Sequence, residues 1–110
     1  MEKAQEKIRW NRKLYAGTSA RRHRRAILHD LRTGKPRLET YVILLREDTA
    51  QLEMVHNSFL ALEQSCRPPF QVVGIAEGRA EGLLLLKRIV EDVYRKDTKL
   101  NYAEYFADNS

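Results

Sequence analysis

Two continuous apolar runs interrupt an otherwise polar chain, TYVILL at 40–45 and FQVVGIA at 70–76. Their β-branched and aliphatic residues are typical of strands that are buried on both faces of a sheet. A shorter run, KLYAG at 13–17, has a similar character and ends at a glycine. The pattern therefore predicts three strands.

Each of these strands is followed by a segment in which apolar residues recur with helical spacing. The first helix is expected over about 20–33, and Gly34 followed by Pro36 marks its end. The second is expected to begin near Asp48, which has capping-box spacing to Gln51, and to end at the RPP sequence of 67–69. The third is expected over about 79–96. The expected apolar faces comprise Ala20, Ile27, Leu28 and Leu31; Leu52, Val55, Phe59 and Leu62; and Leu83, Leu86, Ile89, Val90 and Val93.

Strands that alternate with helices of this length require right-handed crossovers and a parallel sheet. We therefore expect one α/β domain over 1–110, with a three-stranded, mostly parallel sheet in β-α-β-α-β-α order. Residues 1–12 form a basic N-terminal segment, and residues 97–110 form an aromatic C-terminal tail. A second interpretation of KIRWNRKLYA at 7–16 makes it the end of an N-terminal helix, which would leave the sheet with two strands of its own.

The composition is that of a soluble globular protein. Hydrophobic residues make up 43% of the 110 residues and charged residues 32%. No apolar run has the length that a bilayer requires, and the charged N-terminus lacks the apolar stretch of a signal peptide. The single cysteine, Cys66, cannot form an internal disulfide, which suits a reducing compartment. We expect a cytoplasmic protein without a membrane partner.

Positive charge is concentrated in the first third of the chain. Residues 1–37 contain twelve Lys and Arg against three Asp and Glu, whereas residues 38–110 have a small excess of acidic residues. Such an asymmetry indicates a basic face that attracts phosphate-rich partners, although many small proteins carry a basic face for solubility alone.

The start of the first expected helix combines a turn sequence with a cluster of arginines. Basic residues are unfavourable at the positive end of a helix dipole, so an anion is expected there unless the arginines simply face water. Gly17, Thr18 and Ser19 offer close approach, hydroxyls and free backbone N–H groups, as a phosphate site requires. The same three residues also fit an ordinary turn and helix cap. The candidate anion- or phosphate-binding residues are Gly17, Thr18, Ser19, Arg21, Arg22, Arg24 and Arg25.

In a parallel sheet, the ends of all three strands would bring this site together with 46–49 and 77–79 along one edge. Carboxylates at 47, 48 and 77 would then lie beside it as candidate metal ligands or acid–base groups, although Asp48 is better explained as a helix cap. His23 and His29 are six residues apart and cannot share a metal as an i, i+4 pair would. The sequence indicates no catalytic residue, metal or cofactor, and it favours a protein that is not an enzyme.

Nucleic-acid or other polyanion binding through the basic N-terminal third is the preferred function. Trp10 and Tyr15 lie among the basic residues and are candidates for stacking on bases, unless they cover the core. The alternatives are a small anionic-ligand or regulatory module with its site at the carboxyl ends of the strands, and an oligomeric interaction protein without catalysis. The apolar residues of 82–94 and the aromatic tail exceed what one core needs, which predicts a homodimer.

Overall fold

A four-stranded mixed sheet lies at the centre of the structure, a computed structural model that describes residues 8–66 and 69–107. The strand order is β1-β4-β2-β3. β1 is parallel to β4, whereas β2 is antiparallel to both of its neighbours. The strands are β1 (Arg9–Ala16), β2 (Thr40–Arg46), β3 (Leu52–His56) and β4 (Phe70–Glu77).

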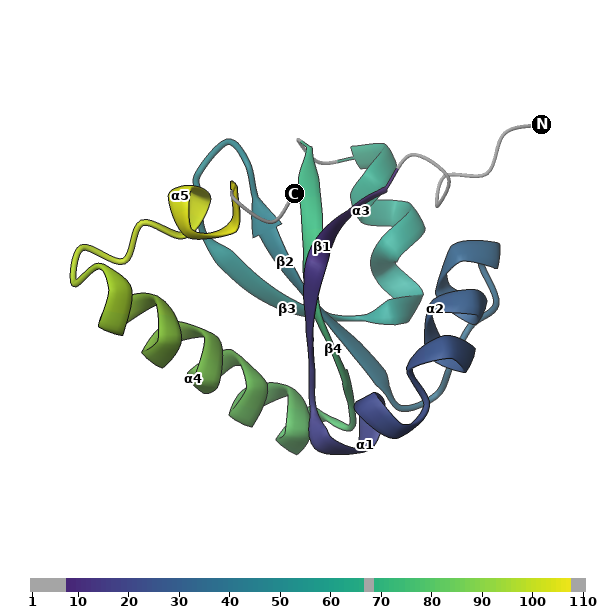
Figure 1. The fold of residues 1–110 in the computed structure, drawn as a ribbon. Helices are drawn as coiled ribbons and strands as arrows, with labels where there is room; N and C mark the ends of the chain where they lie inside the picture. The colour runs from purple at the N-terminus through teal and green to yellow at the C-terminus, as the bar shows by residue number, and fades with distance from the viewer. Residues whose placement is uncertain (1–7, 67–68, 108–110) are drawn as a thin grey trace.

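Helices cover both faces of this sheet. One face carries α1 (Thr18–Arg22), α2 (Arg24–Thr33) and α3 (Leu60–Cys66), and the other carries α4 (Arg79–Lys96) and α5 (Tyr102–Ala107) (Figure 1). A short 3₁₀ helix, η2 (Asn57–Phe59), connects β3 to α3. The three-layer arrangement explains why the runs in β2 and β4 are continuously apolar, because the two central strands have a core on each side.

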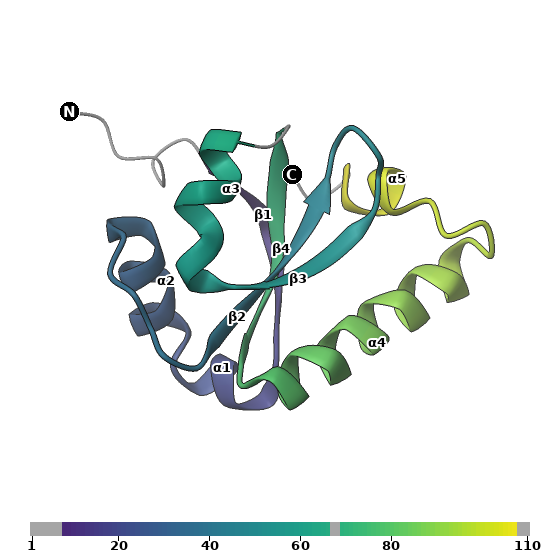
Figure 2. The same cartoon turned by 180° about the vertical axis from the view of Figure 1, so that it is seen from behind.

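The three-stranded, mostly parallel sheet expected from the sequence is wrong in strand number and in direction. The segment expected as a helix from Asp48 instead turns back at 47–51 and pairs as β3 along β2 in regular register, from Tyr41 opposite His56 to Leu45 opposite Leu52. Figure 2 shows β3 on the near edge of the sheet. The apolar residues from Leu52 onward fit helical spacing, but they also fit a strand whose side chains alternate between the two faces of the sheet. Leu52 and Met54 pack against one core and Val55 against the other.

The direction of β2 also separates the strand ends that a parallel sheet would have gathered. Gly17 follows β1 and Glu77 is the last residue of β4, and because these two strands are parallel both residues lie at one end of the sheet. Arg46 pairs with Phe70 at the start of β4, so residues 46–49 lie at the opposite end. The expected single edge with three strand ends is therefore wrong.

The first strand is confirmed, and the helical alternative for this segment is wrong over the residues that the structure describes. β1 begins at Arg9, earlier than the run KLYAG suggested, and its register against β4 shifts between Trp10 and Tyr15. Residues 1–7, part of the expected basic N-terminal segment, lie outside the described residues. The helix expected over 20–33 is interrupted at His23 and ends, as expected, at Gly34, which has the left-handed φ of 79°.

The apolar face expected for the long helix α4 is confirmed in part, because Ile89 and Val93 are fully buried as expected. Its fully buried residues are Gly82, Leu85, Ile89 and Val93. Leu83 is 48% exposed and Leu86 only partly buried, because the buried stripe follows i, i+3 and i+4 spacing from Gly82. The tail returns as α5, in which Phe106 is 1% exposed. No helix within the described residues is both long and apolar enough to cross a membrane.

Candidate functional site

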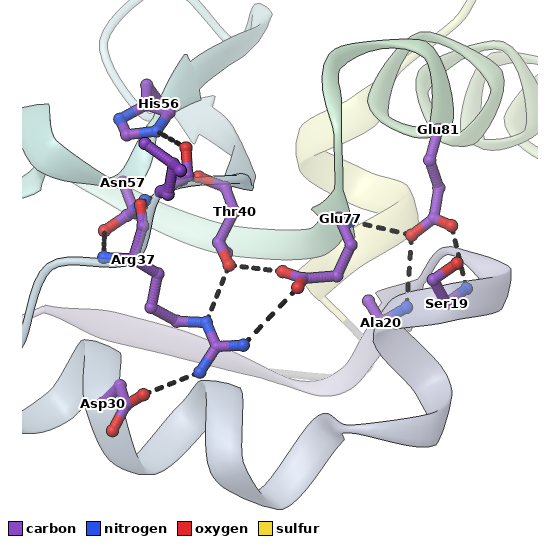
Figure 3. A network of polar contacts seen from close by, with 10 residues as sticks. Ser19, Ala20, Asp30, Arg37, Thr40, His56, Asn57, Glu77 and Glu81 are labelled. Carbon is purple, nitrogen blue, oxygen red and sulfur yellow. Dashed lines mark hydrogen bonds and ion pairs between the residues drawn. The ribbon is translucent and has the colours of Figure 1, made fainter.

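The turn at 17–19 is held by a carboxylate from within the chain. Glu81, in the first turn of α4, accepts hydrogen bonds from the backbone N–H groups of Ser19 at 2.8 Å and Ala20 at 3.2 Å (Figure 3). It also accepts one from the N–H of Glu77 at 2.8 Å. The side chains of Thr18 and Ser19 do not cap α1. The N–H groups of Ser19 and Ala20 are therefore held by Glu81, and that of Gly17 donates to the Ile75 carbonyl at 3.0 Å.

The contact between Glu81 and the turn explains both the glycine at position 17 and the lowered pKa of Glu81. A Cβ at Gly17 would overlap the Glu81 side chain, so the close approach that glycine allows serves Glu81. Burial alone would raise the pKa of Glu81, but the backbone donors outweigh it and lower the pKa below its ordinary value. The carboxylate supplies the negative charge that the helix dipole favours at the start of α1.

A second polar network adjoins Glu81 at the same end of the sheet. The Arg37 guanidinium pairs with Asp30 at 2.6 Å and with Glu77 at 3.4 Å, and it donates to the Thr40 hydroxyl at 2.8 Å. Thr40 also hydrogen-bonds Glu77 (Figure 3). Asn57 holds the connection to β2 by bonding the backbone of Arg37 and the carbonyl of Thr40. These groups satisfy one another, so we assign the network to holding α2, β2 and β4 together.

The arginines named from the sequence lie on α1 and α2 beside β1. Arg21, Arg22 and Arg25 are exposed, and Arg24 is half-buried with its guanidinium 3.5 Å from the Leu14 carbonyl. None of these four side chains forms an ion pair with another described residue. Their charges are therefore available to an external anion.

Two of these arginines meet further cationic residues around a pocket of about 320 Å³. Arg21 and Arg24 line it together with Lys13 of β1 and Arg88 of α4. Lys13 and Arg88 likewise have no carboxylate partner among residues 8–66 and 69–107. Sequence reasoning missed Arg88, because it lies outside the basic first third of the chain and reaches the pocket only through the packing of α4.

The aromatic residues proposed for base stacking are largely engaged in the fold. Trp10 packs partly buried against the core on the α2 side, with the Arg32 guanidinium 5.4 Å from its ring centroid. Tyr15 packs edge-on to Phe106 with ring centroids 6.1 Å apart, and its other contacts include the Arg88 guanidinium at 5.7 Å. Tyr15 lines the basic pocket, whereas Trp10 does not.

The opposite end of the sheet carries a buried charge cluster. The Arg46 side chain is 4% exposed and pairs with Glu53 at 2.5 Å and with Glu63. It also lies 5.5 Å from the centre of the Phe70 ring. Desolvation lowers the pKa of Arg46, but the two carboxylates outweigh it and raise the pKa. Asp48, expected as a helix cap, instead accepts from the N–H of Thr49 within the β2–β3 turn.

The histidines and acidic residues form no metal centre in the described part of the chain. No group of three or more His, Cys, Asp or Glu within residues 8–66 and 69–107 is placed to hold a metal ion. His23 and His29 are exposed, and His56 uses Nε2 to bond the Leu38 carbonyl at 2.8 Å. The side chain of Cys66 lies outside the described residues.

Comparison of the chain with models of known protein families, with curated proteins and with solved structures finds no match. What the protein binds must therefore be inferred from its own side chains.

Proposed function

We propose that this protein binds nucleic acid through the basic surface beside β1. The observation that carries the proposal is the pocket lined by Lys13, Arg21, Arg24 and Arg88, whose charges have no partner among the described residues. Arg and Lys provide most of the contacts to nucleic-acid phosphates. Four cations around one pocket, none with a carboxylate partner in the described part of the chain, raise the local concentration of a polyanion.

Further exposed arginines extend the cationic surface away from the pocket. Arg22 and Arg25 lie on α1 and α2 and are exposed. An anion that reached only the pocket would not need them, whereas a strand of linked phosphates offers a partner to each. The extension of the charge therefore favours a polymer over a single anion.

Occupation of the turn by Glu81 counts against the alternative site at the strand ends. A small anion would have to displace a carboxylate that three backbone N–H groups already hold. We therefore place the proposed contacts on the side chains around the pocket and not on the backbone of 17–19.

Salt-dependent binding tests the proposal. We expect fluorescence anisotropy with labelled single- and double-stranded DNA and RNA to show affinity that falls steeply as salt rises. Replacing Arg21 or Arg24 by alanine should flatten the log–log slope by about 0.7–0.9 for each phosphate that the side chain neutralises. A flat titration against all four nucleic acids at low salt would contradict the proposal.

Two double charge reversals distinguish binding at this site from attraction by the net charge of the protein. The double variant Arg21→Glu/Arg25→Glu should abolish binding. The double variant Lys96→Glu/Lys99→Glu makes the same change in net charge at and just beyond the far end of α4, and it should retain most of the binding. All four positions are exposed, so thermal stability should change by only a few degrees, roughly what surface substitutions allow. An equal loss of binding in both double variants would indicate nonspecific attraction and no site beside β1.

A further inference from the structure

The pocket beside β1 also contains acceptors, which a site for phosphate alone does not need. Asp92 of α4 and Tyr105 of α5 line it together with Tyr15. α4 and α5 lie on one side of β1, and α2 lies on the other (Figure 1). Asp92 is itself engaged, since Oδ1 pairs with Arg95 at 3.3 Å and Oδ2 accepts from Tyr15. A carboxylate and phenol oxygens beside cationic side chains suit a ligand that carries a hydrogen-bond donor close to its anionic group.

The hydrogen bonds among these three side chains fix the direction of each proton. Tyr15 Oη lies 2.8 Å from Asp92 Oδ2 and 2.7 Å from Tyr105 Oη. A carboxylate can only accept, so Tyr15 donates its single proton to Asp92. The Tyr15 oxygen must then accept the proton of Tyr105, whose own oxygen keeps lone pairs for a donor on a ligand.

The environment of Tyr15 keeps this arrangement in place. Burial, together with the hydrogen bonds to Tyr105 and Asp92, raises the pKa of Tyr15 far above its ordinary value. Tyr15 therefore remains a donor at all physiological pH values. The pocket consequently combines four cationic donors with an acceptor group made of Asp92 and Tyr105.

We propose that the pocket holds a ribonucleotide unit, with its phosphate at the cationic side chains and a ribose hydroxyl donating to Tyr105. The 2′-hydroxyl is the group by which a protein distinguishes RNA from DNA at a given position. A volume of about 320 Å³ lies at the lower end of the range for small-ligand pockets, roughly 300–1,000 Å³. The inference rests on the proposed nucleic-acid binding and adds to it a preference for RNA.

Oligouridine and oligodeoxyuridine of equal length provide the direct test, because they differ only in the 2′-hydroxyl. The wild-type protein should bind the ribo-oligomer more tightly by about tenfold or more at the same salt concentration, the effect of one hydrogen bond to a charged or well-placed acceptor. Equal affinities with the expected salt dependence would overturn this inference and leave the proposed function standing. Absence of binding to both oligomers would overturn both.

Two tyrosine substitutions locate the discrimination. Tyr105→Phe removes the free acceptor and keeps the ring, so it should reduce the ribo-oligomer's affinity to that of the deoxy-oligomer and leave the latter unchanged. Tyr102→Phe makes the same chemical change in the same helix, outside the pocket, and should retain the preference. A preference for the ribo-oligomer that survives Tyr105→Phe would overturn the assignment of the hydroxyl to this acceptor.

A free ribonucleotide and a unit within a strand present the same phosphate and hydroxyls, and competition distinguishes them. Uridine 5′-monophosphate that displaces the ribo-oligomer at comparable concentration supports a free nucleotide as the occupant. Retention of the oligomer supports a unit within a strand. Displacement by deoxyuridine monophosphate at the same concentration would overturn the role of the hydroxyl.

Discussion

At the scale of single residues, the Glu81 carboxylate resolves the conflict between the basic start of the first helix and its dipole. The sequence around 17–25 indicated that an anion belongs there, and the structure supplies one from 62 residues further along the chain. No local pattern could have identified Glu81, because its spacing within α4 is that of an ordinary first-turn acid.

Acid should weaken the protein partly through Glu81. Its pKa is lowered in the folded state, so its contribution is complete above the ordinary value near 4.5 and is lost as the pH falls through the lowered value. Glu81→Gln should reduce the free energy of unfolding at pH 7 by about 1–2 kcal/mol, as loss of a helix cap does. The difference between the two proteins should shrink as the pH is lowered in urea unfolding experiments.

The exposed Glu91, on the same helix, gives a matched control for this prediction. Glu91→Gln should leave both the stability at pH 7 and its decline in acid close to those of the wild type. If Glu81→Gln and the wild type differ by the same amount at every pH, the carboxylate does not hold the turn as described.

At the scale of elements, the sequence identified α4 and two of its fully buried residues, Ile89 and Val93, but it did not assign Leu85 to the buried face. Leu85 is 3% exposed and Leu84 is 69% exposed, although the two are adjacent in an apolar run. Leu85→Ala should lower the free energy of unfolding by about 2–5 kcal/mol, since it leaves a cavity in the core. Leu84→Ala should change it by roughly 0.5 kcal/mol or less. Urea unfolding of the two variants would show similar losses if α4 were rotated from the position described.

The elements that could be predicted are those whose pattern has one interpretation. The apolar runs in β2 and β4 are longer than those of a strand or helix with one face in water. Gly34 ends α2 in the left-handed conformation that glycine favours. β3 was missed because five half-buried residues carry a weak signal that helical spacing can imitate. Because β3 was missed, β2 was expected to run parallel to its neighbours. The expected grouping of the three strand ends depended on that direction.

The pocket could be predicted only in part, for a related reason. Arg21 and Arg24 stand in an obvious basic cluster, and the sequence pointed to them. Arg88, Asp92 and Tyr105 reach the same pocket from α4 and α5 through tertiary packing, for which a single sequence has no local signal.

At the scale of the whole molecule, α5 of the C-terminal tail contributes to the core through Phe106. Phe106 is packed by Tyr15 and Tyr105 and is 1% exposed. Phe106→Ala should therefore cost about 3–5 kcal/mol of stability, whereas Glu104→Ala on the exposed side of α5 should cost little. Equal thermal midpoints for both variants would indicate that α5 is not packed against the sheet in solution.

The homodimer expected from the sequence stays a prediction. Charge replacement at Phe106 would disrupt the fold, so it cannot report on an interface. Sedimentation equilibrium of the wild-type chain at micromolar concentration should give twice the mass of the 12.9 kDa monomer. A mass of one chain that does not change with concentration would contradict the prediction.

The side chain of Asn11 has a consequence for the order in which the protein assembles. It is buried in β1 and bonds Gln71 and the Phe106 carbonyl, which are 60 and 95 residues away in the chain. During synthesis on the ribosome, the β2–β3 hairpin can form from neighbouring residues, whereas β1 has no strand to pair with until β4 has emerged. Contacts across such distances slow folding, because a long loop must close before any of them is made. β1 therefore cannot enter the sheet before β4 has been synthesised, and its basic side chains stay outside the sheet until then.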